Sequence, residues 1–267
     1  LDQGYKPWSI LALTFTNKAA REMKERIARQ VGENLARYLW MGTFHSIFSR
    51  ILRAEADAIG FSSNFTIYDA SDSKSLVKSI IREMGLDDKT YKPGVVQSRI
   101  SQAKNHLILP DTYAASGELY RADADAKMPQ LRDIYLRYWE RCRQSDAMDF
   151  DDLLVYTYQC SNRIRRSATN MQRISNMCWW MSIRIQTIAQ HCIVQLLTGK
   201  HRRVCVVGDD AQSIYSFRGA NIDNILNFTN LYREARLFKL EQNYRSTQTI
   251  VKAANSLIAK NREQIRK

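Results

Sequence analysis

The sequence predicts an α/β protein, a parallel sheet into which a helical segment is inserted. Short apolar runs alternate with stretches of helical spacing near both ends of the 267 residues. From about Ser73 to Ser145 the strand signals stop, and only helical spacing remains. At 45% apolar and 25% charged residues, the composition excludes a disordered chain. No apolar run reaches membrane-spanning length, and the first residues show no secretion signal.

The first part of the chain alternates between strands and helices. Ser9–Phe15 is a short apolar run typical of a buried strand, and Thr16 and Asn17 are cap candidates for a helix over Ala19–Val31. The next elements are a strand at Trp40–Phe44, a helix from Thr43 or Ser46 to about Glu55, and a strand at Phe65–Tyr68 that is followed by the cap candidates Asp69 and Ser71.

The middle of the chain is predicted to be helical, because apolar residues recur there at intervals of three and four. Leu131, Ile134, Tyr135 and Tyr138 are one such set. Alternation then resumes, with strands predicted at Arg203–Val207 and Ala235–Leu240 and a helix at Thr247–Asn261.

The charge of the chain is +13, which by itself weakly favours an anionic partner such as nucleic acid. The charge is uneven, since Leu153–Gly208 contains eight Lys and Arg but no Asp or Glu in 56 residues. Five cysteines without a CxxC pair indicate reduced thiols, so we expect a cytoplasmic protein without a metal site.

Two strand ends carry residues that suit a nucleic acid. Thr16 and Asn17 follow the first strand with Phe15, and Thr43 and His45 follow the second in the run GTFHS. Hydroxyls, an amide and helix N-termini at the carboxyl edge of a sheet could hold phosphates, and Phe15 could stack on a base. On pattern alone, an ordinary strand–cap–helix junction with a buried Phe15 is the favoured interpretation of the first run, and a lone His such as His45 is more often a hydrogen-bonding residue than a catalyst.

Two later runs have similar chemistry. In VVGDDAQSIYSFRGAN (206–221), two aspartates at a strand tip suit Mg²⁺ or hydrogen bonding, Gln212 could orient a water, and Tyr215, Phe217 and Arg218 suit base stacking and phosphate pairing. In LEQNYRS (240–246), Tyr244 and Arg245 could contact a nucleobase and a phosphate. Alone, each run is also compatible with a helix cap and core aromatics.

Together, and in this order, these runs resemble the UvrD/PcrA/Rep group of superfamily 1 DNA helicases. LALTFTNKAAREMKERI (11–27) resembles motif Ia, GTFHS motif Ib, AMDFDDLL (147–154) the DFDDLL segment, GDDAQSIYSFRGA motif III and LEQNYRS motif IV. The resemblance implies a RecA-like P-loop NTPase sheet with an inserted all-helical subdomain. The implied divisions are domain 1A at 1–72 and 146–236, subdomain 1B at 73–145, and the start of domain 2A at 237–267.

The resemblance also implies roles for individual residues. The path of single-stranded DNA would be lined by Phe15, Thr16, Asn17, Thr43 and His45. Tyr215, Phe217 and Arg218 would also contact DNA, at the junction between the DNA and ATP. Gln212 would sense the γ-phosphate, Arg245 would contact it, and Tyr244 would pack near the nucleotide; Gln212 and Arg245 are therefore the catalytic candidates. Asp151 and Asp152 match the family without an assigned role.

The implied activity is that of an ATP- and Mg²⁺-dependent 3′→5′ DNA helicase or single-stranded DNA translocase, acting on single-stranded and 3′-tailed duplex DNA in the bacterial cytoplasm, near the nucleoid. Two alternatives stay open: a non-catalytic module that binds single-stranded DNA or a protein, and the helicase part of a helicase–nuclease. The 267 residues contain no GxxxxGK[ST] phosphate loop, which the family places before motif Ia. We therefore expect this chain by itself to be an incomplete, ATPase-inactive fragment.

A second family element, motif II, is also missing. The family reads DEYQDTN between DFDDLL and motif III, whereas this chain reads NMCWWMSIRIQT (176–187). Shifting the reading frame by one base forces Leu from Cys178–Trp179, Val from Trp179–Trp180 and Asp from Trp180–Met181, and permitted codons continue as EYQDTN. We therefore expect about residues 160–187 to be read in a shifted frame, through a sequencing error or a double insertion–deletion. The alternative is a divergent segment with a Trp-rich core strand.

Overall fold

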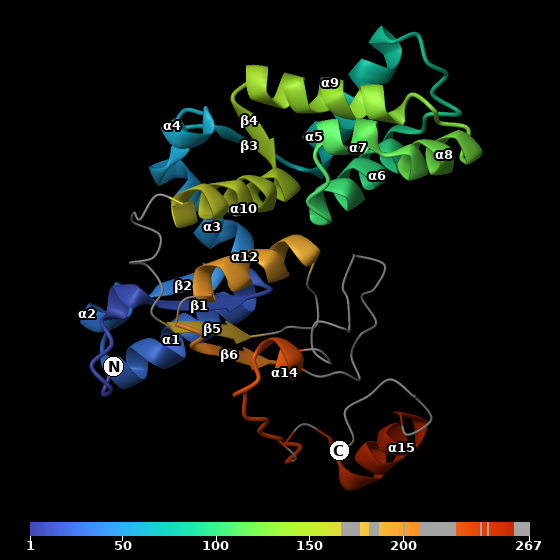
Figure 1. Ribbon diagram of the computed structural model, residues 1–267. Coiled ribbons are helices and arrows are strands. Elements are labelled where there is room, and N and C mark those ends of the chain that lie inside the picture. Colours follow the sequence, from blue (N-terminus) through green and yellow to red (C-terminus); the bar gives the residue numbers. More distant parts are fainter. Residues whose placement is uncertain are drawn as a thin grey trace.

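The computed structural model places two bodies of secondary structure one above the other, as Figure 1 shows. A parallel sheet with flanking helices contains the N-terminus, and a group of helices lies on its far side beyond α10. The structure describes residues 1–166, 177–181, 187–199, 201–208, 228–240, 242–244 and 246–258.

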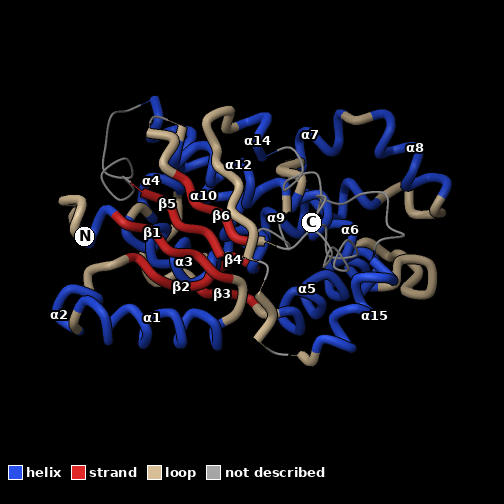
Figure 2. The backbone as a smooth tube through the Cα atoms, turned by 90° about the horizontal axis from the view of Figure 1, so that it is seen from below, coloured by secondary structure: helices blue, strands red, loops and turns tan. Residues whose placement is uncertain are grey.

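The larger sheet has four parallel strands in the order β2-β1-β5-β6. Figure 2 shows them side by side in a twisted row. Each of the three sequence-predicted strands at 9–15, 40–44 and 203–207 is confirmed within one or two residues. The strands of this sheet are β1 (Ile10–Thr14), β2 (Trp40–Thr43), β5 (Met177–Met181) and β6 (Val204–Val207).

Helices cover both faces of this sheet. Alternate residues of β1 point to opposite faces. Leu11 and Leu13 pack with α3, α10 and α12, whereas Ala12 packs with the apolar side of α1. The elements around the sheet are η1 (Pro7–Ser9), α1 (Asn17–Val31), α2 (Glu33–Ala36), α3 (Phe44–Ala54), α10 (Phe150–Arg166) and α12 (Ile188–Thr198). The short helix α4 (Ala56–Ile59) lies away from this sheet, with Ile59 packed against a cluster that includes Met148 and Tyr156.

Five helices, here called the helical lobe, occupy the chain between β3 and β4, which pair in parallel as a separate two-stranded sheet. Tyr135 and Tyr138 of α9 lie in the lobe's core with Val77 and Ile81 of α5, as the helical spacing predicts. Asp69 caps α5 as predicted, accepting hydrogen bonds from the backbone of Ser71 and Asp72. The elements are β3 (Thr66–Tyr68), α5 (Ala70–Glu83), α6 (Pro93–Asn105), α7 (Pro110–Ala115), α8 (Gly117–Asp125), α9 (Leu131–Gln144) and β4 (Ala147–Asp149).

The last described elements are α14 (Phe228–Leu231) and α15 (Gln248–Ile258), and the second of these confirms the predicted helix at 247–261 as far as residue 258. The strand predicted at 235–240 is wrong, since these residues form no strand in the structure. Phe238 and Leu240 are 80% and 89% exposed there, so among the described residues no strand shelters the apolar side chains of this run. In the described ranges, no helix combines the length and apolar character needed to cross a bilayer.

Candidate nucleic-acid interface at the carboxyl edge of the sheet

The carboxyl ends of β1 and β2 lie side by side. Thr14 pairs with Thr43 in the parallel register, so the residues that follow each strand emerge next to each other. Neighbouring strands are about 4.8 Å apart, which brings the two predicted DNA-lining runs together at one edge. Phe15, Thr16 and Asn17 are all exposed there, and the Phe15 ring is 41% exposed.

The first run is held by the N-terminus of α1. Thr16 is the N-cap residue, and its hydroxyl accepts a hydrogen bond from Ala19 N at 3.1 Å. This satisfies one of the free N–H groups of the first turn. The cap fixes the backbone of Thr16 in an extended conformation, so the preceding residue, Phe15, leaves the sheet with its ring facing solvent.

The second run is built around a capping box. The Thr43 hydroxyl accepts from Ser46 N at 3.3 Å, while Ser46 Oγ accepts from Thr43 N at 3.0 Å. Gly42 makes this arrangement possible, because a Cβ at this position would lie only 2.6 Å from Ser46 Oγ. Thr43 is only 8% exposed, and its hydroxyl is already engaged in capping α3.

His45 lies half-buried in the first turn of α3 and contacts a second aromatic residue. The Phe150 ring meets the imidazole edge-on, with the ring centroids 5.5 Å apart. Phe150 is the first residue of α10 and is 48% exposed. Burial lowers the pKa of His45, so its imidazole is neutral at physiological pH.

Comparison with known proteins identifies the family to which the chain belongs. Residues 1–233 match the family described as the UvrD/REP helicase N-terminal domain. The chain belongs to that family. It is 41% identical over 261 residues to an ATP-dependent DNA helicase PcrA of Leuconostoc citreum, and 41% identical over 263 residues to the PcrA helicase of Staphylococcus aureus strain Mu50. These alignments cover 98% of this chain, but the chain spans only about a third of the relatives' length, 34% and 35%.

Only some of the predicted site residues of this UvrD/REP helicase chain can be placed. Phe15, Thr16, Asn17, Thr43 and His45 come together at the sheet edge, as described above. Tyr244 lies 93% exposed before α15, so the structure does not pack it into a site. The remaining predicted residues lie outside the described residues: Gln212, Tyr215, Phe217, Arg218 and Arg245.

Phe150 is the residue at this edge that the sequence reasoning missed. It lies within the DFDDLL run, between Asp149 and Asp151, where the family resemblance gives it no separate role. Its signal is a single large apolar side chain flanked by carboxylates, which is weak in sequence. The exposed ring beside His45 is visible only once α3 and α10 are packed together.

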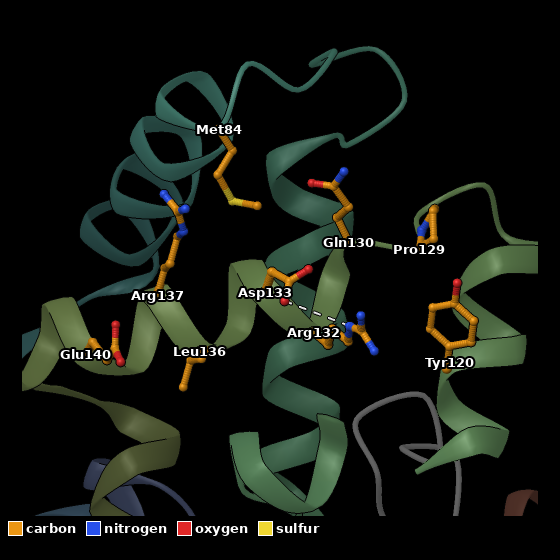
Figure 3. A pocket seen from close by; sticks show the side chains of 9 residues that line it. All are labelled: Met84, Tyr120, Pro129, Gln130, Arg132, Asp133, Leu136, Arg137 and Glu140. Carbon is orange, nitrogen blue, oxygen red and sulfur yellow. Dashed lines mark ion pairs between the residues drawn. The ribbon is translucent and has the colours of Figure 1, made fainter. Parts of the chain in front are cut away.

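Of two hollows in the chain, one adjoins this edge and the other lies away from it. The larger, about 710 Å³, opens on the helical lobe and is shown in Figure 3; it contains none of the predicted site residues. Side chains of both signs line it, including the Arg132–Asp133 ion pair at 3.8 Å. The smaller, about 330 Å³, is lined by Tyr68, Phe150 and Asp151 together with polar residues of α6, so it adjoins the interface.

The UvrD/REP family implies ATP and Mg²⁺, and the part of the chain that the structure describes contains few of the groups that would hold them. No group of three or more His, Cys, Asp or Glu side chains is arranged there to hold a metal ion. The side chain of Tyr244 stands in solvent, and the predicted γ-phosphate contacts fall outside the described ranges. Most of the residues that the family resemblance assigns to ATP therefore lie outside the described ranges.

Proposed function

We propose that the carboxyl edge of the sheet binds single-stranded DNA. The observation that carries this proposal is the register of β1 with β2, which joins the exposed Phe15, the first turns of α1 and α3, and the His45–Phe150 pair at one edge. Aromatic rings that face solvent can stack on bases of any sequence, and helix N-termini favour phosphate groups. A single strand of DNA offers bases for stacking and phosphates for the helix N-termini at each nucleotide, so both kinds of contact can be made to one strand.

We further propose that the whole protein is an ATP-dependent 3′→5′ DNA helicase or translocase. The relatives that match 98% of this chain are named ATP-dependent DNA helicases. In this proposal the four-stranded sheet belongs to a RecA-like domain 1A, the helical lobe is subdomain 1B, and residues 237–267 begin domain 2A. Mg²⁺ and ATP would act in the whole protein, on single-stranded and 3′-tailed DNA.

The chain of 267 residues is best tested as a DNA-binding module. A fluorescein-labelled oligo(dT) is titrated with the purified chain and followed by anisotropy, with a duplex of the same length as comparison. We expect saturable binding of the single strand that weakens as salt rises from about 50 to about 200 mM. Equal binding of the duplex, or no binding of oligo(dT), would contradict the proposal.

The same material tests the ATPase expectation. Because the 267 residues contain no phosphate loop, we expect no DNA-stimulated phosphate release from this chain. Robust turnover would show that the nucleotide is held by groups other than those that the family resemblance implies. DNA binding without turnover is also the result that favours a non-catalytic binding module for the chain by itself.

We also propose that residues 160–187 are read in a shifted frame. β5 lies between β1 and β6, in the centre of the sheet, and Met181 at its carboxyl end pairs with Val207. The Asp that the shifted frame forces from Trp180–Met181 would therefore stand at the same edge as Thr14 and Thr43. Carboxylates at such a position suit a Mg²⁺ shell. Sequencing the coding DNA across codons 159–188 tests the first of the two origins, since a clean trace that encodes Cys-Trp-Trp-Met in frame excludes a sequencing error.

A further inference from the structure

Lys104 is a buried cation in the helical lobe. It is the penultimate residue of α6, and its side chain has no solvent exposure. Its Nζ lies 2.7 Å from Asp149 Oδ2 and 2.7 Å from Asp152 Oδ1. Burial alone would lower the pKa of Lys104, but the two carboxylates raise it well above its usual value, so the side chain stays charged. A buried charge is tolerated only when it is paired in this way.

The two carboxylates also build the first turn of α10. Asp149 N donates to Asp152 Oδ2 at 3.0 Å, and Asp152 N donates to Asp149 Oδ1 at 2.8 Å, which is a reciprocal capping box. The box uses one oxygen of each carboxylate, and Lys104 takes the other oxygen of each. The Tyr138 hydroxyl, from α9, donates a further hydrogen bond to Asp149 Oδ2 at 2.8 Å.

The next residue of α6 holds the same turn from the side. Asn105 Nδ2 donates to Asp151 Oδ1 at 2.9 Å. The end of α6 therefore bonds all three carboxylates of the DFDDLL run through two consecutive residues. Phe150 is the residue of this turn that remains outside the polar cluster, and its half-exposed ring rests against His45.

We propose that Lys104 is a positioning residue for the DNA-binding edge, because it fixes the first turn of α10 and thereby the place of the Phe150 ring against His45. The proposal has two tests, here called its geometric arm and its DNA arm. The DNA arm, which measures DNA binding, rests on the proposed function, whereas the geometric arm, which measures the Phe150–His45 contact, does not. It assigns the aspartates of the DFDDLL run a role as anchors for the helical lobe. A buried ion pair that acted only on stability would leave the Phe150–His45 contact unchanged in the folded protein.

The geometric arm is read from the His45 imidazole. The chain has four histidines, so the His45 ring signals can be assigned by labelling histidine and comparing with His45→Gln. Ring currents from Phe150 shift these signals. We expect Lys104→Met to move the His45 signals toward their position in Phe150→Ala. The matched control is Val96→Ala, a fully buried truncation on the same helix outside the ion cluster, which we expect to lower stability without moving them.

The DNA arm is a double-mutant cycle with oligo(dT). Lys104→Met and Phe150→Ala are each expected to raise Kd by about tenfold, the loss of one stacked base. The double variant is expected to bind no more weakly than Phe150→Ala alone, because Lys104 acts through Phe150. The proposal would be overturned if the increases in Kd of the two single variants multiplied in the double variant. It would also be overturned if the His45 signals stayed at their wild-type position in folded Lys104→Met.

Two further results keep the outcomes separate. If the wild-type chain binds no oligo(dT), the proposed function fails, while the His45 signals still decide whether Lys104 positions Phe150. If Lys104→Met does not fold, Asp152→Asn removes one of the two carboxylate charges that Lys104 Nζ pairs with, at nearly unchanged side-chain volume. We then expect a smaller shift of the His45 signals in the same direction, and unchanged signals would overturn the proposal.

Discussion

Replacing Phe15 with alanine tests the proposed DNA path at the aromatic ring that directly follows β1. Stacking of a base on an aromatic side chain contributes about 1–3 kcal/mol, so losing it should raise Kd for oligo(dT) by about 5- to 150-fold. The ring is 41% exposed, and a fully buried Phe→Ala change costs about 3–5 kcal/mol, so we expect a stability loss of only about 2 kcal/mol. Affinity is measured by anisotropy and stability by urea unfolding of the same preparation.

Tyr38 provides the matched control for this experiment. It is 47% exposed and precedes β2, so it lies at the amino edge of the same sheet. Tyr38→Ala removes a ring of similar exposure at the opposite edge, and we expect its Kd to stay within about twofold of wild type, the scale of a neutral surface change. Equal losses of affinity in the two variants would refute a DNA path at the carboxyl edge, as would unchanged affinity in Phe15→Ala.

Two further predictions concern the turn after β2. In Gly42→Ala the new Cβ would crowd Ser46 Oγ and break the capping box, so we expect a loss of about 0.5–2 kcal/mol in urea unfolding, and little additional loss when Ser46→Ala is combined with it. Additive losses would show that the box is intact in Gly42→Ala. Burial lowers the pKa of His45, so the unfolded state binds its proton more readily, and stability should fall as pH drops through about 6.5. As pH falls from about 7.5 to about 5.5, the free energy of unfolding of His45→Gln should rise relative to that of wild type, by at most about 1.4 kcal/mol per pH unit. Parallel pH profiles of the two proteins would contradict this.

Most of the sheet and its first helices could be predicted from the sequence because their signals are local. An apolar run of five to seven residues followed by a hydroxyl residue and a helical pattern is enough to place β1 and α1, and the same holds for β2 and α3. The cap of Thr16 also follows from its neighbours in the chain, whereas the pattern alone favours a buried Phe15 and the structure leaves it 41% exposed.

What the sequence could not show depends on partners far along the chain. β4 has only three residues and is a strand because it pairs with β3, across the entire helical lobe. The run at 235–240 has strand composition, but it pairs with no strand in the part of the chain that the structure describes, and its side chains are exposed. Lys104 resembles any surface lysine of a helix until Asp149 and Asp152 are brought to it from 45 or more residues away.

The pairing of β3 with β4 makes the helical lobe a detachable unit of the chain. The chain leaves β3 after Tyr68, opposite Asp149, and returns at Ala147, opposite Thr66. The exit and the entry are thus separated by about the length of a three-residue strand, but the two strands are parallel, so a connection between them must cross back over the pair and needs about a dozen residues or more. Excising residues 70–145 in favour of such a crossover would strip Asp149 and Asp152 of their buried cation. Replacing the lobe would therefore require neutral residues at those two positions as well as a crossover of sufficient length.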